Sequence, residues 1–167
     1  MAVKIVVLSD THCRDWEDVH PDIRKAVTLA DIVVHCGDFT YMAVVEGLQR
    51  NAKRSVVVHG NSDQVDVRRA IPYVQVIEIE GVRVGVTHPA WGGPEFNLSE
   101  LLPDFPDPVD AILFGHFHET VNELREGVLF LNPGQAYASF RVPATIATLT
   151  IDKGRMTPEI VIIEKER

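Results

Sequence analysis

Cysteine is scarce in this sequence of 167 residues, which contains only Cys13 and Cys36. Two cysteines cannot build a disulfide scaffold, and we expect each to be a small buried hydrophobic residue. Apolar runs are short as well, because none reaches the roughly 18 residues that a membrane-spanning helix needs. The chain begins with the strand-like "VKIVVLSD" at residues 3–10 rather than with a signal peptide. We therefore expect a cytoplasmic protein with no membrane association.

Positive charge is in deficit, since 16 lysine and arginine residues stand against 24 aspartate and glutamate residues, for a formal net charge of -8. A surface with this balance repels a nucleic-acid backbone at long range, which disfavours nucleic acid as a partner. A small anionic substrate remains compatible with the sequence, because bound cations can reverse the field inside one cleft. The sequence leaves the formation of a homo-oligomer open.

Low-complexity segments and solenoid-length repeats are absent, and 46% of the residues are hydrophobic and 24% charged. This composition is typical of a globular protein. A chain of this length falls within the usual size of one domain, so we expect residues 1–167 to form a single domain.

Short runs of valine, isoleucine and leucine alternate with segments of helical periodicity. The runs are too short for helices and are typical of buried strands; they cover residues 3–8, 32–34, 56–58, 82–86 and 111–114. Apolar residues recur at helical spacing in residues 20–31 and 41–53, between the first three runs. The resulting β-α-β-α-β order predicts an α/β protein.

The later part of the sequence has the pattern of antiparallel hairpins. Residues 73–87 alternate on both sides of Glu80-Gly81, and residues 144–152 and 158–165 flank Lys153-Gly154. The sheets are therefore predicted to be mixed, parallel early and antiparallel late. Prolines in "LLPDFPDPVD", residues 101–110, predict a surface loop there.

Five of the apolar runs end in side chains that can bind a metal. In α/β sheets ligands bind at the carboxyl ends of strands, so these side chains are predicted to converge on one crevice. They are Asp10 and His12, Asp38, Asn61, His88, and His116 and His118.

The spacing supports this convergence. Residues two apart in an extended segment point to the same face, so Asp10 and His12 are predicted to face one ion together, as are His116 and His118. Any one of these residues alone would be an ordinary hydrogen-bonded residue at the end of a strand. Five such segments together, three of them with an adjacent glycine, favour a metal site.

The donor set indicates two ions rather than one. Two aspartates, one asparagine and four histidines exceed the needs of one tetrahedral ion, and they divide between two ions that share Asp38 as a bridging carboxylate. Nitrogen and oxygen ligands without thiolate favour manganese, iron, cobalt, nickel or zinc over calcium and magnesium, and we place manganese first.

Charge favours a phosphate ester as the substrate. Two divalent cations and two aspartates leave a surplus of about two positive charges, which attracts an anion. Two ions roughly 3.5–4 Å apart can hold a hydroxide between them and clamp a phosphoryl oxygen, which suits in-line attack at phosphorus.

The order of these motifs resembles that of the calcineurin-like metallophosphoesterases, and in particular their small single-domain bacterial and archaeal phosphodiesterases. The resemblance rests on "DTH" (10–12), "GD" (37–38), "GNSD" (60–63), the histidine at 88 and "GHFH" (115–118), with "NPGQ" (132–135) similar to a late "NPGS" motif. It implies a four-layer α/β/β/α sandwich, in which two mixed β-sheets pack face to face and are flanked by helices.

The resemblance also implies roles for individual residues. One metal would be held by Asp10, His12, Asp38 and His118, and the other by Asp38, Asn61, His88 and His116. We take Asp38, Asn61, His88 and Asp63 as the candidate catalytic residues, and a small phosphate ester as the substrate.

Two departures from the family pattern bear on the chemistry. Ser62 stands where many members have a histidine that assists the leaving group, so we expect a preference for diesters or for good leaving groups such as aryl oxides. Trp91, followed by Gly92 and Gly93, either packs on its loop or forms a rim for an aryl or nucleoside group, and packing is the favoured interpretation.

Two other functions compete with a metal-dependent phosphodiesterase. The first is a non-catalytic metal-binding scaffold, because the superfamily resembles in fold the small retromer subunit. The second is a nuclease, which the acidic charge disfavours. The complete set of seven ligands favours the enzyme, since a scaffold has no physical need for two ions that share a carboxylate.

Overall fold

The computed structural model describes residues 1–93 and 95–163 and places them in two five-stranded β-sheets. The order of strands in the first sheet is β10-β9-β1-β2-β3. It consists of β1 (Val3–Leu8), β2 (Ile32–His35), β3 (Ser55–Val57), β9 (Ala144–Asp152) and β10 (Arg155–Ile163). Strands β1, β2 and β3 run parallel to one another, whereas β9 runs antiparallel to both of its neighbours, β1 and β10. This sheet is therefore mixed, as predicted.

The second sheet has the order β4-β5-β6-β8-β7 and is also mixed. It consists of β4 (Val74–Ile79), β5 (Val82–Thr87), β6 (Ala111–Phe114), β7 (Thr120–Arg125) and β8 (Val128–Pro133). Both predicted hairpins are present, and a third, β7–β8, was not predicted. All three turn at a residue pair with positive φ, namely Glu80-Gly81, Glu126-Gly127 and Lys153-Gly154. Residues 164 and 165 of the predicted second hairpin lie outside the described residues.

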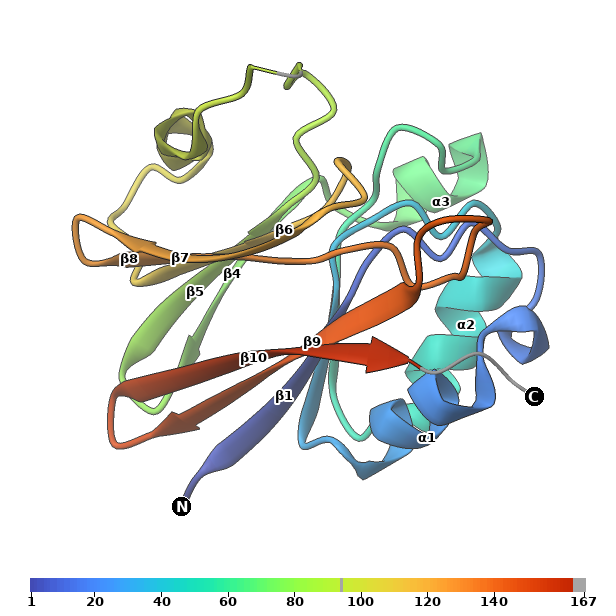
Figure 1. Ribbon diagram of the computed structural model, residues 1–167, viewed down its shortest axis with the longest axis horizontal. Coiled ribbons are helices and arrows are strands. Elements are labelled where there is room, and N and C mark those ends of the chain that lie inside the picture. The colour runs from blue at the N-terminus through green and yellow to red at the C-terminus, as the bar shows by residue number, and fades with distance from the viewer. Residues whose placement is uncertain (94, 164–167) are drawn as a thin grey trace.

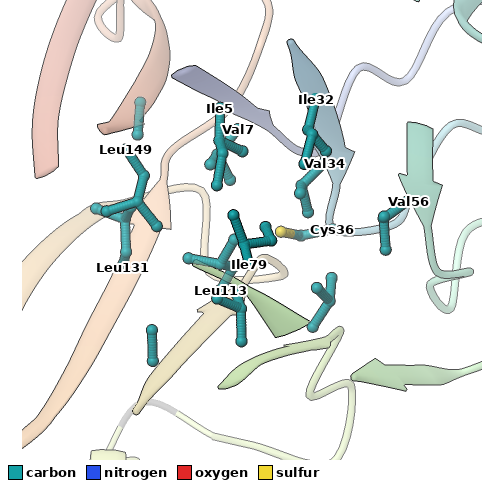
Figure 2. Packing of buried hydrophobic residues seen from close by; sticks show 14 of the residues in the cluster. Ile5, Val7, Ile32, Val34, Cys36, Val56, Ile79, Leu113, Leu131 and Leu149 are labelled. Carbon is teal, nitrogen blue, oxygen red and sulfur yellow. The ribbon is translucent and has the colours of Figure 1, made fainter. Parts of the chain in front are cut away.

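The two sheets pack face to face, and alternate residues of each strand divide between two cores. Ile5 and Val7 of β1 point toward the second sheet, where they meet Leu113 and Leu131 in the core between the sheets (Figure 2). Val6 and Leu8 point the other way, toward the helices. Cys36 is buried in the core between the sheets, as expected, whereas Cys13 is only partly buried.

Three helices cover the outer face of the first sheet: α1 (Pro21–Leu29), α2 (Met42–Asn51) and α3 (Val65–Ala70) (Figure 1). Helices α1 and α2 present apolar residues to the sheet at helical spacing, for example Ile23 and Val27 of α1, and α3 presents Val67. A short 3-10 helix, η1 (Trp16–Asp18), adds the buried Trp16 to the same layer. None of the described helices is long and apolar enough to cross a membrane.

The outer face of the second sheet is covered by a 3-10 helix, η2 (Leu98–Asp104), and the chain after it. The prediction of a surface loop at residues 101–110 is therefore wrong for residues 101–104, which belong to η2, whereas residues 105–110 have no helix or strand. Leu101, Phe105 and Val109 are buried there because they pack on Ile112 and Phe114 of β6. The four layers match the predicted α/β/β/α sandwich, with η2 as the fourth layer.

Candidate metal centre

Seven predicted ligands lie in five loops at one end of the two sheets. Strands β1, β2 and β3 lead into three of these loops, and β5 and β6 of the second sheet lead into the other two. Because all five strands end at the same edge of the sandwich, side chains that are up to 108 positions apart in sequence come together. These side chains are those of Asp10, His12, Asp38, Asn61, His88, His116 and His118.

Four of them form a compact cluster. One donor atom each from Asp10, His12, Asp38 and His118 lies within 4.8 Å of the others. His12 Nε2 is 3.3 Å from His118 Nε2 and 3.6 Å from Asp10 Oδ1, and His118 Nε2 is 3.3 Å from the same Asp10 oxygen. Nitrogen and carboxylate oxygen donors that face one point are the arrangement in which a transition metal is bound.

The remaining ligands form a second group around Asn61. Its Oδ1 atom lies 3.1 Å from His88 Nε2 and 3.0 Å from His116 Nδ1. Asp38 connects this group to the first, because its Oδ2 atom is 3.4 Å from His88 Nε2 and 3.5 Å from His12 Nε2. One carboxylate oxygen is therefore within reach of both groups.

The backbone that delivers these ligands differs from the extended geometry that we predicted. Five of the seven ligand residues have a positive φ, in the left-handed region that residues other than glycine rarely occupy. The i and i+2 rule of a strand therefore does not explain why the pairs converge; the backbone instead enters the left-handed region after β1, β2 and β6. The five φ values are 54° for Asp10, 44° for His12, 60° for Asp38, 84° for His116 and 59° for His118.

Glycines allow the ligand loops to approach one another. A Cβ atom at Gly60 would collide with the Asp38 carboxylate, and one at Gly115 would collide with the Ser9 hydroxyl. Gly37 has a φ of 96°, and a Cβ atom there would lie 2.7 Å from His88 Nδ1. Glycine is needed at these positions for the close contact of loops from different strands.

The electrostatics of the first cluster fit a cation. Asp10 is fully buried, and among the described residues its Oδ1 atom has no hydrogen-bond partner, although two histidine nitrogens lie beside it. Burial alone would raise the pKa of the Asp10 carboxyl, but contacts with His118 and His12 hold that pKa well below its usual range. A buried carboxylate oxygen that lacks a donor, next to two imidazoles, is suited to a metal ion.

Residues 3–154 match the family model of the calcineurin-like phosphoesterase superfamily domain. The chain belongs to this superfamily. A phosphodiesterase of Methanocaldococcus jannaschii is 27% identical over 167 residues, which cover 90% of this chain and 95% of that protein. A protein of Thermotoga maritima, solved by NMR, has a TM-score of 0.77 at 31% identity and covers 96% of this chain and 99% of its own. Vacuolar protein sorting 29 of Cryptosporidium parvum, with a TM-score of 0.75 at 18% identity and coverage of 98% and 99%, shares the fold.

These comparisons confirm the predicted superfamily and fold. The superfamily uses divalent metals, and the donor set described above fits them. Residues of this chain outside the predicted ligand set then show how the ligands are held.

Two of the histidines have their ring orientation fixed by a hydrogen bond at Nδ1. The Nδ1–H of His88 donates to the Cys36 carbonyl oxygen at 2.7 Å, and that of His118 donates to Gln135 Oε1 at 3.2 Å. Gln135 is itself oriented, because its amide nitrogen donates to the Tyr137 carbonyl oxygen at 2.8 Å. In the neutral tautomer that this bond selects, the lone pair is on Nε2, the atom that lies beside the aspartate oxygens of the centre.

Asp63 lies behind the ligands rather than among them. It is buried, and its carboxylate accepts backbone N–H bonds from Gly60 at 2.7 Å, Thr40 at 2.6 Å and Asp38 at 3.1 Å. Burial raises the pKa of this carboxyl, and the donors from Gly60 and Thr40 oppose the rise. Asp63 therefore ties the Asp38 loop to the Asn61 loop.

His35 makes a similar connection between the first two ligand loops. It is fully buried and stacked on Phe39, accepts a bond from the Gly37 N–H at Nδ1, and lies 3.1 Å from Thr11 Oγ1 through Nε2. Burial lowers the pKa of His35 to about 3, so the ring is neutral. The place of His35 before the Gly37-Asp38 turn is compatible with such a role, but its partners Thr11 and Phe39 are not predictable from spacing in the sequence.

Two other residues that were singled out lie outside the cluster. Trp91 is 47% exposed, and its ring contacts the Phe96 ring with centroids 5.5 Å apart, which agrees with the favoured packing interpretation. Ser62 is exposed, and its backbone N–H donates to Asp38 Oδ1 at 2.8 Å. This bond holds one oxygen of Asp38 and leaves Oδ2 for the centre.

Proposed function

We propose that the protein is a phosphodiesterase that binds two divalent metal ions and hydrolyses a small phosphate ester. The observation that carries the proposal is the position of Asp38 Oδ2 between His12 Nε2 and His88 Nε2, at 3.5 and 3.4 Å. One oxygen equidistant from two groups of ligands is the geometry of a bridging carboxylate. The relatives named above, among them a phosphodiesterase, support the reaction class.

Each residue has a role in this proposal. Asp10, His12, Asp38 and His118 hold one ion, and Asp38, Asn61, His88 and His116 hold the other. Manganese is the first candidate, ahead of nickel, zinc, iron and cobalt, because the donors are nitrogen and oxygen without thiolate. The two ions would supply a hydroxide nucleophile for in-line attack and positive charge for the phosphoryl oxygens.

Asp63 takes part indirectly. Its carboxylate contacts backbone N–H groups of the Asp38 and Asn61 loops, so it would position both ligands rather than touch the substrate. Ser62 offers no strong acid where other members have a histidine, which favours substrates whose leaving group departs without a proton. Aryl diesters meet this condition better than alkyl monoesters.

The test is hydrolysis by protein that is stripped of metal and refilled with manganese, nickel or zinc. The panel contains bis(p-nitrophenyl) phosphate, p-nitrophenyl phosphate, glycerol phosphate and a single-stranded oligonucleotide. We expect the aryl diester to be the best substrate and glycerol phosphate the poorest. Faster turnover of glycerol phosphate would contradict the proposal, and cleavage of the oligonucleotide alone would favour a nuclease.

Matched variants identify the source of the activity. Asp38→Asn should abolish turnover with every metal, because one substitution weakens both groups of ligands. Asp152→Asn is the control, since Asp152 is exposed and lies next to the Ile151–Val3 pair at the opposite end of β1. Metal binding without turnover of any ester would favour the scaffold instead.

A further inference from the structure

An apolar groove lies on the outer face of the second sheet, under the segment that precedes η2. We call it the aromatic groove. Its volume is about 550 Å³, within the range of small-molecule sites. Its apolar surface is formed by Phe96, Leu98, Phe114, Phe117 and Val121.

The aromatic groove begins where the metal ligands end. Phe117 lies between His116 and His118 in sequence, and its ring meets the His116 ring edge-on with centroids 5.1 Å apart. On its other side Phe117 stacks on Phe96, with centroids 4.8 Å apart and an interplanar angle of 25°. A group bound against Phe117 and Phe96 would therefore adjoin the second group of ligands.

The groove extends from this point along β7. Val121, Glu123 and Arg125 all line it, since alternate residues of a strand share a face. At about 3.4 Å per residue, this stretch adds about 13 Å to its length. An elongated ester substituent can therefore lie along the strand while its phosphorus stays at the metal centre.

The charges around the groove select against a second anion. Glu119 and Glu123 line it, and Arg125, the cation among its lining residues, is paired with Glu123 at 2.8 Å. Gly92 and Gly93 also line the groove and add no side chain to it. A flat and uncharged group matches this combination of aromatic walls and acidic rim.

We propose that the aromatic groove binds an uncharged aromatic substituent of the phosphodiester, such as an aryl ring or a nucleobase, and thereby sets substrate preference. The proposal rests on the phosphodiesterase function proposed above. It names the class of ester that the same centre hydrolyses, and it excludes substituents that carry a further phosphate.

The kinetic test compares two diesters with the same leaving group, bis(p-nitrophenyl) phosphate and methyl p-nitrophenyl phosphate. Phe96→Ala removes one aromatic wall, and Val121→Trp fills the groove from β7. Each should lower the ratio of kcat/KM for the diaryl over the methyl ester about tenfold. Phe140→Ala is the matched control, because Phe140 is 91% exposed and does not line the groove.

A binding test separates this proposal from the proposed function. Calorimetry of manganese-loaded protein should show diphenyl phosphate binding at least about tenfold more tightly than dimethyl phosphate. The preference should disappear in Phe96→Ala and Val121→Trp and persist in Phe140→Ala. If Phe96→Ala fails to fold, as judged by circular dichroism, Val121→Trp decides.

The outcomes are distinct. Equal binding of the two phosphates by the wild type, or an unchanged preference in a folded groove variant, would overturn the assignment of the aromatic groove. The protein could instead prefer diphenyl phosphate, lose that preference in the groove variants and hydrolyse neither diester. This result would support the assignment of the aromatic groove and refute the proposed phosphodiesterase function.

Discussion

Replacing Gly60 by alanine should damage the metal centre more than the rest of the fold. Gly60 has no positive φ, so an alanine is compatible with its backbone. The new Cβ atom, however, would collide with Asp38 Oδ1 and would lie 2.8 Å from the Asp38 backbone nitrogen. The Asp38 carboxylate must then retreat, which breaks its bond from the Ser62 N–H and moves Oδ2 away from His12 and His88.

The expected effect is large in activity, together with a loss of stability of about 1–3 kcal/mol, because the backbone at Asp38 must also shift. A retreat of about 1 Å in a group that positions the reacting atoms lowers turnover by about 10²-fold. The assay is hydrolysis of bis(p-nitrophenyl) phosphate by manganese-refilled protein, with metal affinity and urea unfolding measured on the same samples. Because the collision is with a ligand, metal affinity should fall together with turnover.

Gly154→Ala is the control, because it should lose stability without any loss of turnover. Gly154 has a φ of 80°, and a Cβ atom there would meet nothing within 4 Å. Alanine should therefore cost about 1 kcal/mol of stability at this hairpin without any change in turnover. If Gly60→Ala kept the turnover and the metal affinity of the wild type, the reasoning on the bridging carboxylate would be refuted.

Two further predictions concern stability. The buried neutral ring of His35 has a pKa of about 3 in the folded protein, against 6.5 in the unfolded chain. Its contribution to the free energy of unfolding is therefore present above pH 6.5. It is lost as the pH falls toward 3, because the unfolded chain binds the proton first. We expect urea unfolding between pH 4 and 8 to show that the stability advantage of the wild type over His35→Gln shrinks at low pH, by up to about 1.4 kcal/mol per pH unit. Parallel stability profiles of the two proteins would contradict this expectation. Leu131→Ala, in the core between the sheets, should cost about 2–5 kcal/mol in the same assay. Leu124→Ala, at a residue 71% exposed, should change stability by less than about 0.5 kcal/mol, and equal losses in the two variants would refute the assignment of the core.

Much of the fold follows from local patterns in the sequence. Ile5 and Val7 of β1 pack on the second sheet, and Val6 and Leu8 pack on the helices. Because both faces of this strand are buried, its sequence is a continuous apolar run, which identifies it as a strand. The β7–β8 hairpin was missed although its Glu126-Gly127 turn has the same signal as Glu80-Gly81. Its outer strand is mostly exposed, so the apolar run that identified other strands is absent there.

The candidate site was only partly predictable. The ligand types and their place after strands could be read from the sequence, because parallel strands must end at a common edge. The left-handed backbone conformation at Asp10 and His118 could not be predicted from the sequence, since neither aspartate nor histidine requires it. The same applies to Gln135, whose contact with His118 spans 17 residues, and to Asp63, whose contact with Asp38 spans 25.

The ligand geometry is sustained by the groups that lie behind it. Five ligand residues in the left-handed region cost on the order of 1–3 kcal/mol each, and such strain persists only where the surroundings enforce it. Asp63 holds the backbone of the Asp38 loop in this conformation, and His35 holds the Gly37 turn. Both act through hydrogen bonds that do not involve the side chains of the ligands. These bonds are formed by the chain itself, so they would hold the ligand loops without a contribution from a metal. Metal binding would then require little rearrangement of the loops, which favours affinity.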